Sequence, residues 1–201
     1  MKAFFIVLGY LLAFHVCEGQ ECKLTDLSRK YIYVVTADKS KNEYGGSQTS
    51  KITVEIIRKS DNSSIQTLSI KPGTFPNSFN DCSLVSSYVT RKHSKDQGSD
   101  NDWGDFIVAD FNFDGLEDFA VKEDSHNTGA TYDFFIQNRN GRFVKDSFLS
   151  GHYFPYKIDR KNKTLTTATA ATTGGYQETV VKYYPRTGKW RLLRSLHRKT
   201  Y

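Results

Sequence analysis

Cysteine is scarce in this chain of 201 residues, with only Cys17, Cys22 and Cys82 present. None of them forms a CxxC pair, and no HxxxH pair lies near them. A structural zinc ion needs four Cys or His ligands in a tetrahedron, which these residues cannot supply. The scarcity therefore argues against a zinc-stabilised domain.

A sustained helical period is also missing from the chain. Aromatic residues reach 14% and recur with Val, Ile and Thr, which favour a pleated, half-buried surface. The pattern predicts a mainly β fold of antiparallel sheets, either a sandwich or an open barrel. The expected strands are 31–36, 52–58, 65–70, 84–90, 106–111, 118–122, 131–137, 142–145, 164–169, 178–184 and 189–195.

Three turn sequences separate neighbouring strands and predict hairpins. They are Asp61-Asn62-Ser63, the stretch 138–141 (Asn-Arg-Asn-Gly) and the stretch 186–188 (Arg-Thr-Gly). Asn and Gly accept the positive φ that tight hairpin turns require. The polar tract 92–102 is expected to be the least ordered internal stretch.

The first residues have the pattern of a secretory signal peptide. Lys2 supplies a positive start, residues 4–14 are apolar, and small Cys17 and Gly19 stand at −3 and −1 of a cut before Gln20. The apolar run is too short to anchor the chain across a bilayer. We therefore expect a signal peptide over 1–19, a single β domain over 20–201, and a secreted or periplasmic location.

The cut would leave Cys22 and Cys82 as an even pair in an oxidising compartment. A disulfide between them is the natural expectation there. It would tie the start of the mature chain to its middle.

The segment Asp110-Phe-Asn-Phe-Asp-Gly-Leu-Glu-Asp118 carries oxygen ligands at alternate positions, as a hard cation requires. Asp110, Asn112, Asp114 and Asp118 stand at positions one, three, five and nine, and the Leu116 carbonyl is available at seven. Position twelve is Val121 and not the Glu of an EF-hand, and strand-like runs flank the loop. The sequence predicts one Ca²⁺ at a strand-loop-strand corner, with an acidic turn that caps backbone amides as the alternative.

The stretch from Asp110 to Val121 resembles the calcium loop of FG-GAP and VCBS-type proteins. The order of elements that follows is similar to secreted bacterial proteins carrying one such loop. The matching segments are 129–135, 143–150, 163–166, 176–183 and 188–192. This resemblance covers roughly the second half of the chain.

Some members of that group are calcium-dependent inhibitors of lysozyme-like muramidases and act as immunity proteins. The resemblance thus implies a protein-binding role, in which a short loop enters the muramidase cleft. Candidate contacts are Ser150 and Tyr153 in one loop and Tyr176 in another. Since the net charge of +6 survives the predicted cut, the target should be acidic.

Two other classes of function remain open. An adhesion or carbohydrate-binding module would use exposed aromatics such as Tyr153 and Tyr176 to bind glycans. A secreted hydrolase is supported least, because no nucleophile elbow, HExxH or P-loop is present. The basic tail 189–199 is expected to be a soluble edge strand and not a nucleic-acid site, and Asn62 and Asn162 begin glycosylation sequons.

Overall fold

The computed structural model describes residues 20–41, 47–71, 79, 82–92, 103–126, 129–171 and 174–199. Every regular element in these ranges is a β-strand. Across the same ranges, no helix has the length and hydropathy needed to cross a membrane. The predicted signal peptide and most of the polar tract 92–102 lie outside the described residues.

The first sheet has the order β1-β2-β3-β4 and is antiparallel throughout. Its strands are β1 (Gln20–Leu24), β2 (Tyr31–Lys41), β3 (Ser47–Arg58) and β4 (Ser64–Ile70). Buried and half-buried residues alternate along β2 from Tyr31 to Ala37, because successive side chains point to opposite faces. One face of this sheet is therefore apolar.

The middle sheet has the order β10-β8-β7-β6-β5, with β9 also paired to β8. Its strands are β5 (Val85–Ser87), β6 (Phe106–Ala109), β7 (Asp118–His126), β8 (Gly129–Gln137), β9 (Phe143–Lys145) and β10 (His152–Tyr153). β5 and β6 run parallel, and the other described pairs in this sheet are antiparallel. All four residues of β6 are buried, so this sheet is covered on both faces.

The third sheet has the order β11-β12-β13-β14 and is antiparallel. Its strands are β11 (Lys157–Asp159), β12 (Thr164–Ala170), β13 (Tyr176–Tyr184) and β14 (Lys189–Arg198). A bulge opposite Val180 and Val181 shifts the register of β14. The predicted hairpin turns at 61–63, 138–141 and 186–188 are confirmed, and Asn62, Gly141 and Gly188 all have positive φ.

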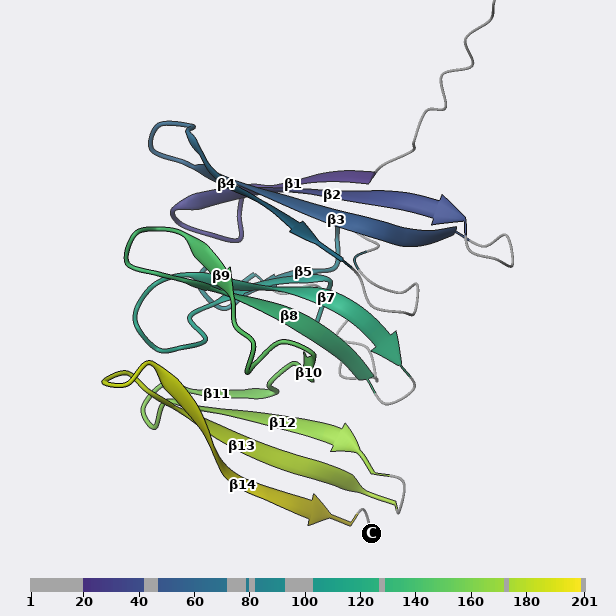
Figure 1. Cartoon of the computed structure of the whole chain (residues 1–201), viewed down its shortest axis with the longest axis vertical. Coiled ribbons are helices and arrows are strands. Elements are labelled where there is room, and N and C mark those ends of the chain that lie inside the picture. The colour runs from purple at the N-terminus through teal and green to yellow at the C-terminus, as the bar shows by residue number, and fades with distance from the viewer. Residues whose placement is uncertain are drawn as a thin grey trace, which may run out of the picture.

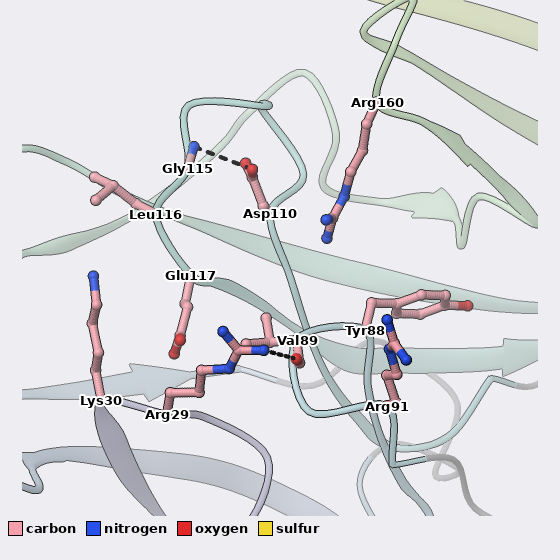
Figure 2. A pocket seen from close by; sticks show the side chains of 10 residues that line it. All are labelled: Arg29, Lys30, Tyr88, Val89, Arg91, Asp110, Gly115, Leu116, Glu117 and Arg160. Carbon is pink, nitrogen blue, oxygen red and sulfur yellow. Dashed lines mark hydrogen bonds between the residues drawn. The ribbon is translucent and has the colours of Figure 1, made fainter.

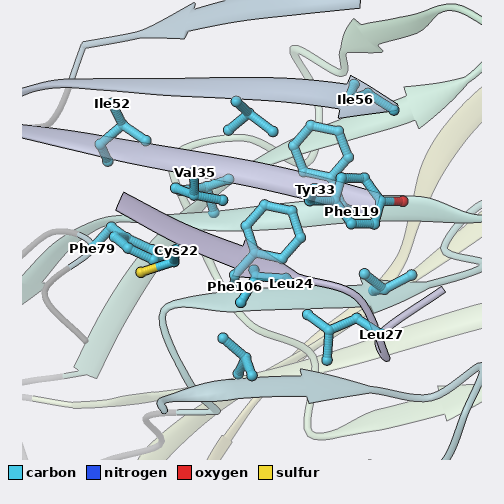
Figure 3. Close-up of a cluster of buried hydrophobic side chains, with 14 of the residues drawn as sticks. Cys22, Leu24, Leu27, Tyr33, Val35, Ile52, Ile56, Phe79, Phe106 and Phe119 are labelled. Atoms are coloured by element: carbon cyan, nitrogen blue, oxygen red, sulfur yellow. The ribbon is translucent and has the colours of Figure 1, made fainter. Parts of the chain in front are cut away.

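The three sheets lie in layers, with the middle sheet between the other two (Figure 1). One apolar core fills the space between the first and middle sheets, where Tyr33, Phe106 and Phe119 are buried together (Figure 3). A second core lies between the middle and third sheets around Phe111, Phe134 and Phe154. Each core contains a cluster of aromatic ring contacts.

The expectation of a mainly β, antiparallel fold is confirmed, but neither a two-sheet sandwich nor an open barrel describes it. Three open sheets are observed because the middle strands are apolar on both faces, and two further sheets are needed to cover them. The short strands β1, β10 and β11 were not predicted, because runs of two to five residues carry little periodicity.

The predicted Cys22–Cys82 disulfide is confirmed, with Cα atoms 5.4 Å apart and 60 residues of separation along the chain. It joins β1 to the segment that leads into β5. The bond therefore links the first sheet to the middle sheet.

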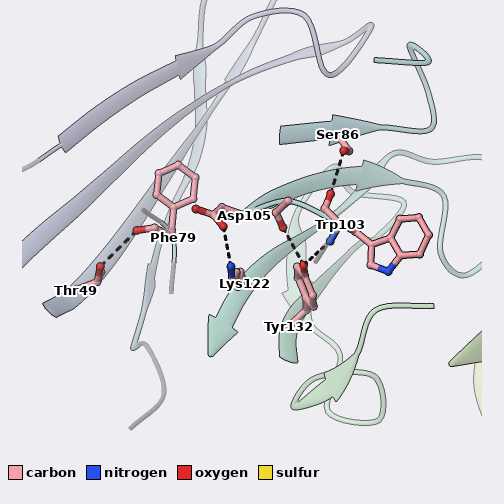
Figure 4. A network of polar contacts seen from close by, with 8 residues as sticks. Thr49, Phe79, Ser86, Trp103, Asp105, Lys122 and Tyr132 are labelled. Atoms are coloured by element: carbon pink, nitrogen blue, oxygen red, sulfur yellow. Dashed lines mark hydrogen bonds and ion pairs between the residues drawn. The ribbon is translucent and has the colours of Figure 1, made fainter. Parts of the chain in front are cut away.

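A buried polar network supports one end of the middle sheet (Figure 4). The Lys122 ammonium lies 3.2 Å from the Asp105 carboxylate, and both side chains are almost fully buried. The Tyr132 hydroxyl donates to the Gly104 carbonyl at 2.9 Å, and the Ser86 hydroxyl donates to the Trp103 carbonyl at 3.0 Å. These bonds satisfy polar groups that burial alone would destabilise.

Candidate metal centre

The acidic segment forms the connection between β6 and β7, two neighbouring antiparallel strands. Ala109 pairs with Asp118, so the ends of the loop are held together by the sheet. The expected strand-loop-strand corner is therefore present. Sheet pairing and burial of Phe111 and Phe113 fix the loop to the middle sheet.

Hydrogen bonds between side chains and backbone amides shape the loop. The Asp110 carboxylate accepts from the Asp114 and Gly115 amides, both at 3.1 Å, and the latter bond is visible in Figure 2. The Asp114 carboxylate accepts from the Leu116 amide at 2.8 Å. Gly115 has φ of 88°, a conformation that glycine adopts at no steric cost.

Asn112 is buried within the same loop. Its side-chain oxygen accepts from the Asp114 amide at 3.1 Å, and its side-chain nitrogen donates to the Asp114 carboxylate at 3.0 Å. Phe113, between these two residues, has φ of 61°, which is uncommon for a residue other than glycine. This backbone conformation brings the side chains of residues 110, 112 and 114 close enough to share the Asp114 amide and carboxylate as hydrogen-bond partners.

Asp118 lies at the base of the loop and is fully buried. One carboxylate oxygen accepts from the Phe111 amide at 2.8 Å and the other from the Gln137 amide at 2.9 Å. Burial raises the pKa of Asp118 well above its usual range, and the charges of Asp114 and Asp110 raise it further. The ionised form is therefore costly unless a positive charge lies close by.

The pKa of Asp110 is also raised, although less than that of Asp118. Burial raises its pKa and the Asp114 charge adds to the effect, whereas the two amide bonds and the charge of Arg160 lower it. The surroundings of two of the predicted ligands, Asp118 and Asp110, thus disfavour their ionised forms.

The backbone of the loop has the shape that a cation site requires. Its carboxylates, however, do not converge on one point. Nowhere in the described ranges do three His, Cys, Asp or Glu side chains approach closely enough to hold a metal on their own. The carboxylates at 110, 114 and 118 are turned toward backbone amides. Each carboxylate oxygen that accepts one N–H keeps capacity for a second contact, and a calcium site would also use Asn112 and the Leu116 carbonyl.

The predicted partner contacts come from two sheets. The Ser150 hydroxyl accepts from the Phe134 amide at 3.0 Å, so it is engaged inside the middle sheet. Tyr153 belongs to β10, and its side chain lies outside the described part of the structure. Tyr176 begins β13, is half-buried, and follows Gly174 and Gly175, both with positive φ.

A basic cleft beside the acidic loop was missed by sequence reasoning. It has a volume of about 380 Å³, and its lining includes Arg29, Lys30, Arg91 and Arg160 (Figure 2). These residues are scattered over the sequence and give no local signal. The signal in the sequence was the positive net charge, which pointed to the C-terminal tail. In the structure, Arg194 and Arg198 of that tail lie 3.3 and 3.6 Å from the Glu178 carboxylate.

No family model matches the chain, and no curated protein sequence matches it. Among solved structures, the fold is similar to a Xanthomonas protein described as related to a type IV secretion system. The two structures have a TM-score of 0.51 and 14% sequence identity, over 88% of this chain and 86% of that one. At this sequence identity the similarity shows the fold alone, which is that of an all-β protein with layered sheets, and it carries no function.

Proposed function

We propose that the protein is an extracytoplasmic, calcium-binding β protein that acts by binding a partner protein, with a lysozyme-like muramidase as the candidate target. The disulfide supports an oxidising compartment, because such bonds persist outside the cytosol. The similarity to a protein related to a secretion system is compatible with a role at the cell envelope.

The observation that carries the calcium assignment is the buried Asp118 carboxylate under a loop of further oxygen ligands. Three carboxylates in one corner repel one another, and no basic side chain pairs with Asp118 among its described contacts. A divalent cation would neutralise that charge. Small rotations of the 110 and 114 side chains from their amide partners would complete a set of oxygens with Asn112 and the Leu116 carbonyl.

The turn before Tyr176 is the better of the two candidate contact loops. The Ser150 hydroxyl already has a partner within the sheet, whereas Tyr176 stands at the start of β13 beside a glycine turn. Gly175 lies so close to the Arg198 carbonyl that an added Cβ would come within 2.0 Å of it. Because Gly175 is held close to β14, the neighbouring Tyr176 can present its aromatic side chain at a low ordering cost on binding.

Calcium would act on this contact indirectly. β7 begins at the end of the molecule that carries the acidic loop, and β12 ends at the opposite end, near Tyr176 (Figure 1). The cation would stabilise the sheets and leave the contact turn chemically unchanged. Loss of calcium should then weaken binding only through loss of folded protein.

The test is inhibition of an acidic lysozyme-like muramidase by the mature protein, measured as the rate of peptidoglycan clearing with calcium and with chelator. Tyr176→Ala should weaken inhibition at least tenfold without lowering the melting temperature, as removal of an aromatic anchor does. Tyr184→Ala, at the other end of β13, is the matched control and should inhibit normally. Asp114→Ala should lower both the melting temperature and inhibition.

Two results would replace this proposal. Capture of cell-wall or host glycans in preference to the muramidase, lost in Tyr176→Ala, would favour a carbohydrate-binding module. Steady hydrolysis of peptidoglycan, nucleic acid or phosphoesters by the wild type, abolished by one carboxylate substitution, would favour an enzyme.

A further inference from the structure

The basic cleft gathers cationic side chains from all three sheets. Arg29 and Lys30 lie in the β1–β2 connection, Arg91 follows β5, and Arg160 lies in the β11–β12 turn. Figure 2 shows Arg160 extending toward Asp110 from one side, with Arg29 and Lys30 on the other. Residues far apart in sequence thus face one space beside the acidic loop.

Most of this positive charge is not held in salt bridges between described residues, although Arg160 also acts electrostatically on Asp110. None of the salt bridges between described residues involves Lys30, Arg91 or Arg160. Arg29 donates to the Val89 carbonyl at 3.4 Å. Positive side chains around a concave surface focus the field and attract an anion.

The two acidic side chains of the lining offset only part of the positive charge of the cleft. The Glu117 carboxylate is buried and accepts from the Ser28 hydroxyl, and the Asp110 carboxylate accepts two loop amides. Four basic and two acidic side chains line the cleft, which leaves an excess of two positive charges. A phosphomonoester carries about −1.5 to −2 near pH 7 and matches that excess.

The size of the cleft limits the ligand. A volume of about 380 Å³ lies at the lower end of the range of small-molecule sites. It suits a phosphate group attached to a body of monosaccharide size. Arginine is suited to phosphate because its planar fork forms two parallel N–H···O bonds.

We propose that this cleft is an oxyanion site that binds a phosphate group, held chiefly by Arg91 and Arg160. The site is separate from the Tyr176 turn and does not depend on the proposed inhibition. Arg29 and Lys30 complete the positive surface on the opposite wall. The phosphate can belong to a sugar-sized ester or be free inorganic phosphate, and two probes distinguish these sources.

The test is a titration of the isotope-labelled mature protein, followed by NMR chemical shifts in calcium-stripped buffer. Glucose 6-phosphate should give saturable shifts confined to residues 29–30, 88–91, 115–117 and 160. Tighter binding of glucose 6-phosphate than of inorganic phosphate identifies an ester as the source, and equal affinity identifies free phosphate. Glucuronate, with one carboxylate charge, should bind at least tenfold more weakly than the better phosphate probe.

The double variant Arg91→Gln/Arg160→Gln should lose at least tenfold in phosphate affinity while keeping the wild-type melting temperature. The matched control is Arg139→Gln/Arg186→Gln, which removes the same charge from two exposed turns outside the cleft. This control should bind as the wild type does. Absence of saturable binding, or an equal loss in both double variants, would overturn the proposal, because the anion would then respond only to net charge.

Discussion

The two outer sheets cover the middle sheet to very different degrees. On the first sheet, the inward residues of β2 and β3 are fully buried, including Tyr33, Val35, Ile52, Val54 and Ile56. On the third sheet, Leu165, Val180 and Trp190 are buried, whereas Leu192, Leu193 and Leu196 of β14 are 58, 50 and 40% exposed. We therefore expect the first and middle sheets to contribute more of the free energy of folding than the third sheet, which buries fewer apolar side chains.

The largest expected effect tests this contrast directly. Phe119 contacts the rings of Tyr33, Phe106, Phe135 and Phe143 in the first core. Phe119→Ala should lower the free energy of unfolding by about 3–5 kcal/mol through lost burial and the cavity that remains. Leu192→Ala, on the exposed edge strand, should change it by about 0.5 kcal/mol or less, and urea unfolding measures both. Similar losses in the two variants would mean that the third sheet is as strongly packed as the first.

Reduction of the disulfide should have the next largest effect. The bond closes a separation of 60 residues, which the chain-entropy model values at up to about 4 kcal/mol. Because the bridge joins the first and middle sheets, hydrogen exchange should accelerate there before it does in β12 and β13. Cys22→Ser/Cys82→Ser is the variant to measure. Unchanged exchange in β1 and β2 would contradict the account.

A smaller effect is expected from the turn between β12 and β13. Gly175 has φ of 101° and an added Cβ would lie 2.0 Å from the Arg198 carbonyl, so Gly175→Ala must displace β14. Gly175→Ala should lower the free energy of unfolding by about 1–3 kcal/mol, the usual range for a residue held in a disfavoured conformation. Gly174→Ala is the control, because φ is positive there but no atom lies within 4 Å of the added Cβ. It should cost about 1 kcal/mol.

The strands of the fold were largely predictable, and their arrangement was not. Periodicity located β2 and β3, where buried residues recur at every second position, whereas β8 and β13 were located by their aromatic and β-branched residues. The layering depends on long-range burial, which no local pattern records. The parallel pairing of β5 with β6 is likewise a long-range feature that no local pattern records.

The candidate metal loop was predictable because its ligands follow one another at fixed spacing from Asp110 to Asp118. What the spacing could not give is the burial of Asp118 or its bonds to the Phe111 and Gln137 amides, since Gln137 belongs to another strand. The basic cleft was unpredictable for the same reason. Arg29, Arg91 and Arg160 meet only because three sheets stack at that end of the molecule.

Calcium binding is the central claim, and thermal unfolding of the mature protein with and without the ion tests it most directly. A ligand that binds only the folded state adds RT ln(1 + [L]/Kd), or about 3 kcal/mol at a hundredfold excess over Kd. The melting temperature should therefore rise with Ca²⁺, fall back with EGTA, and lose this response in Asp114→Ala. A melting temperature that is the same with Ca²⁺ and EGTA, together with an unaffected Asp114→Ala variant, would show that the loop is an acidic turn and holds no metal.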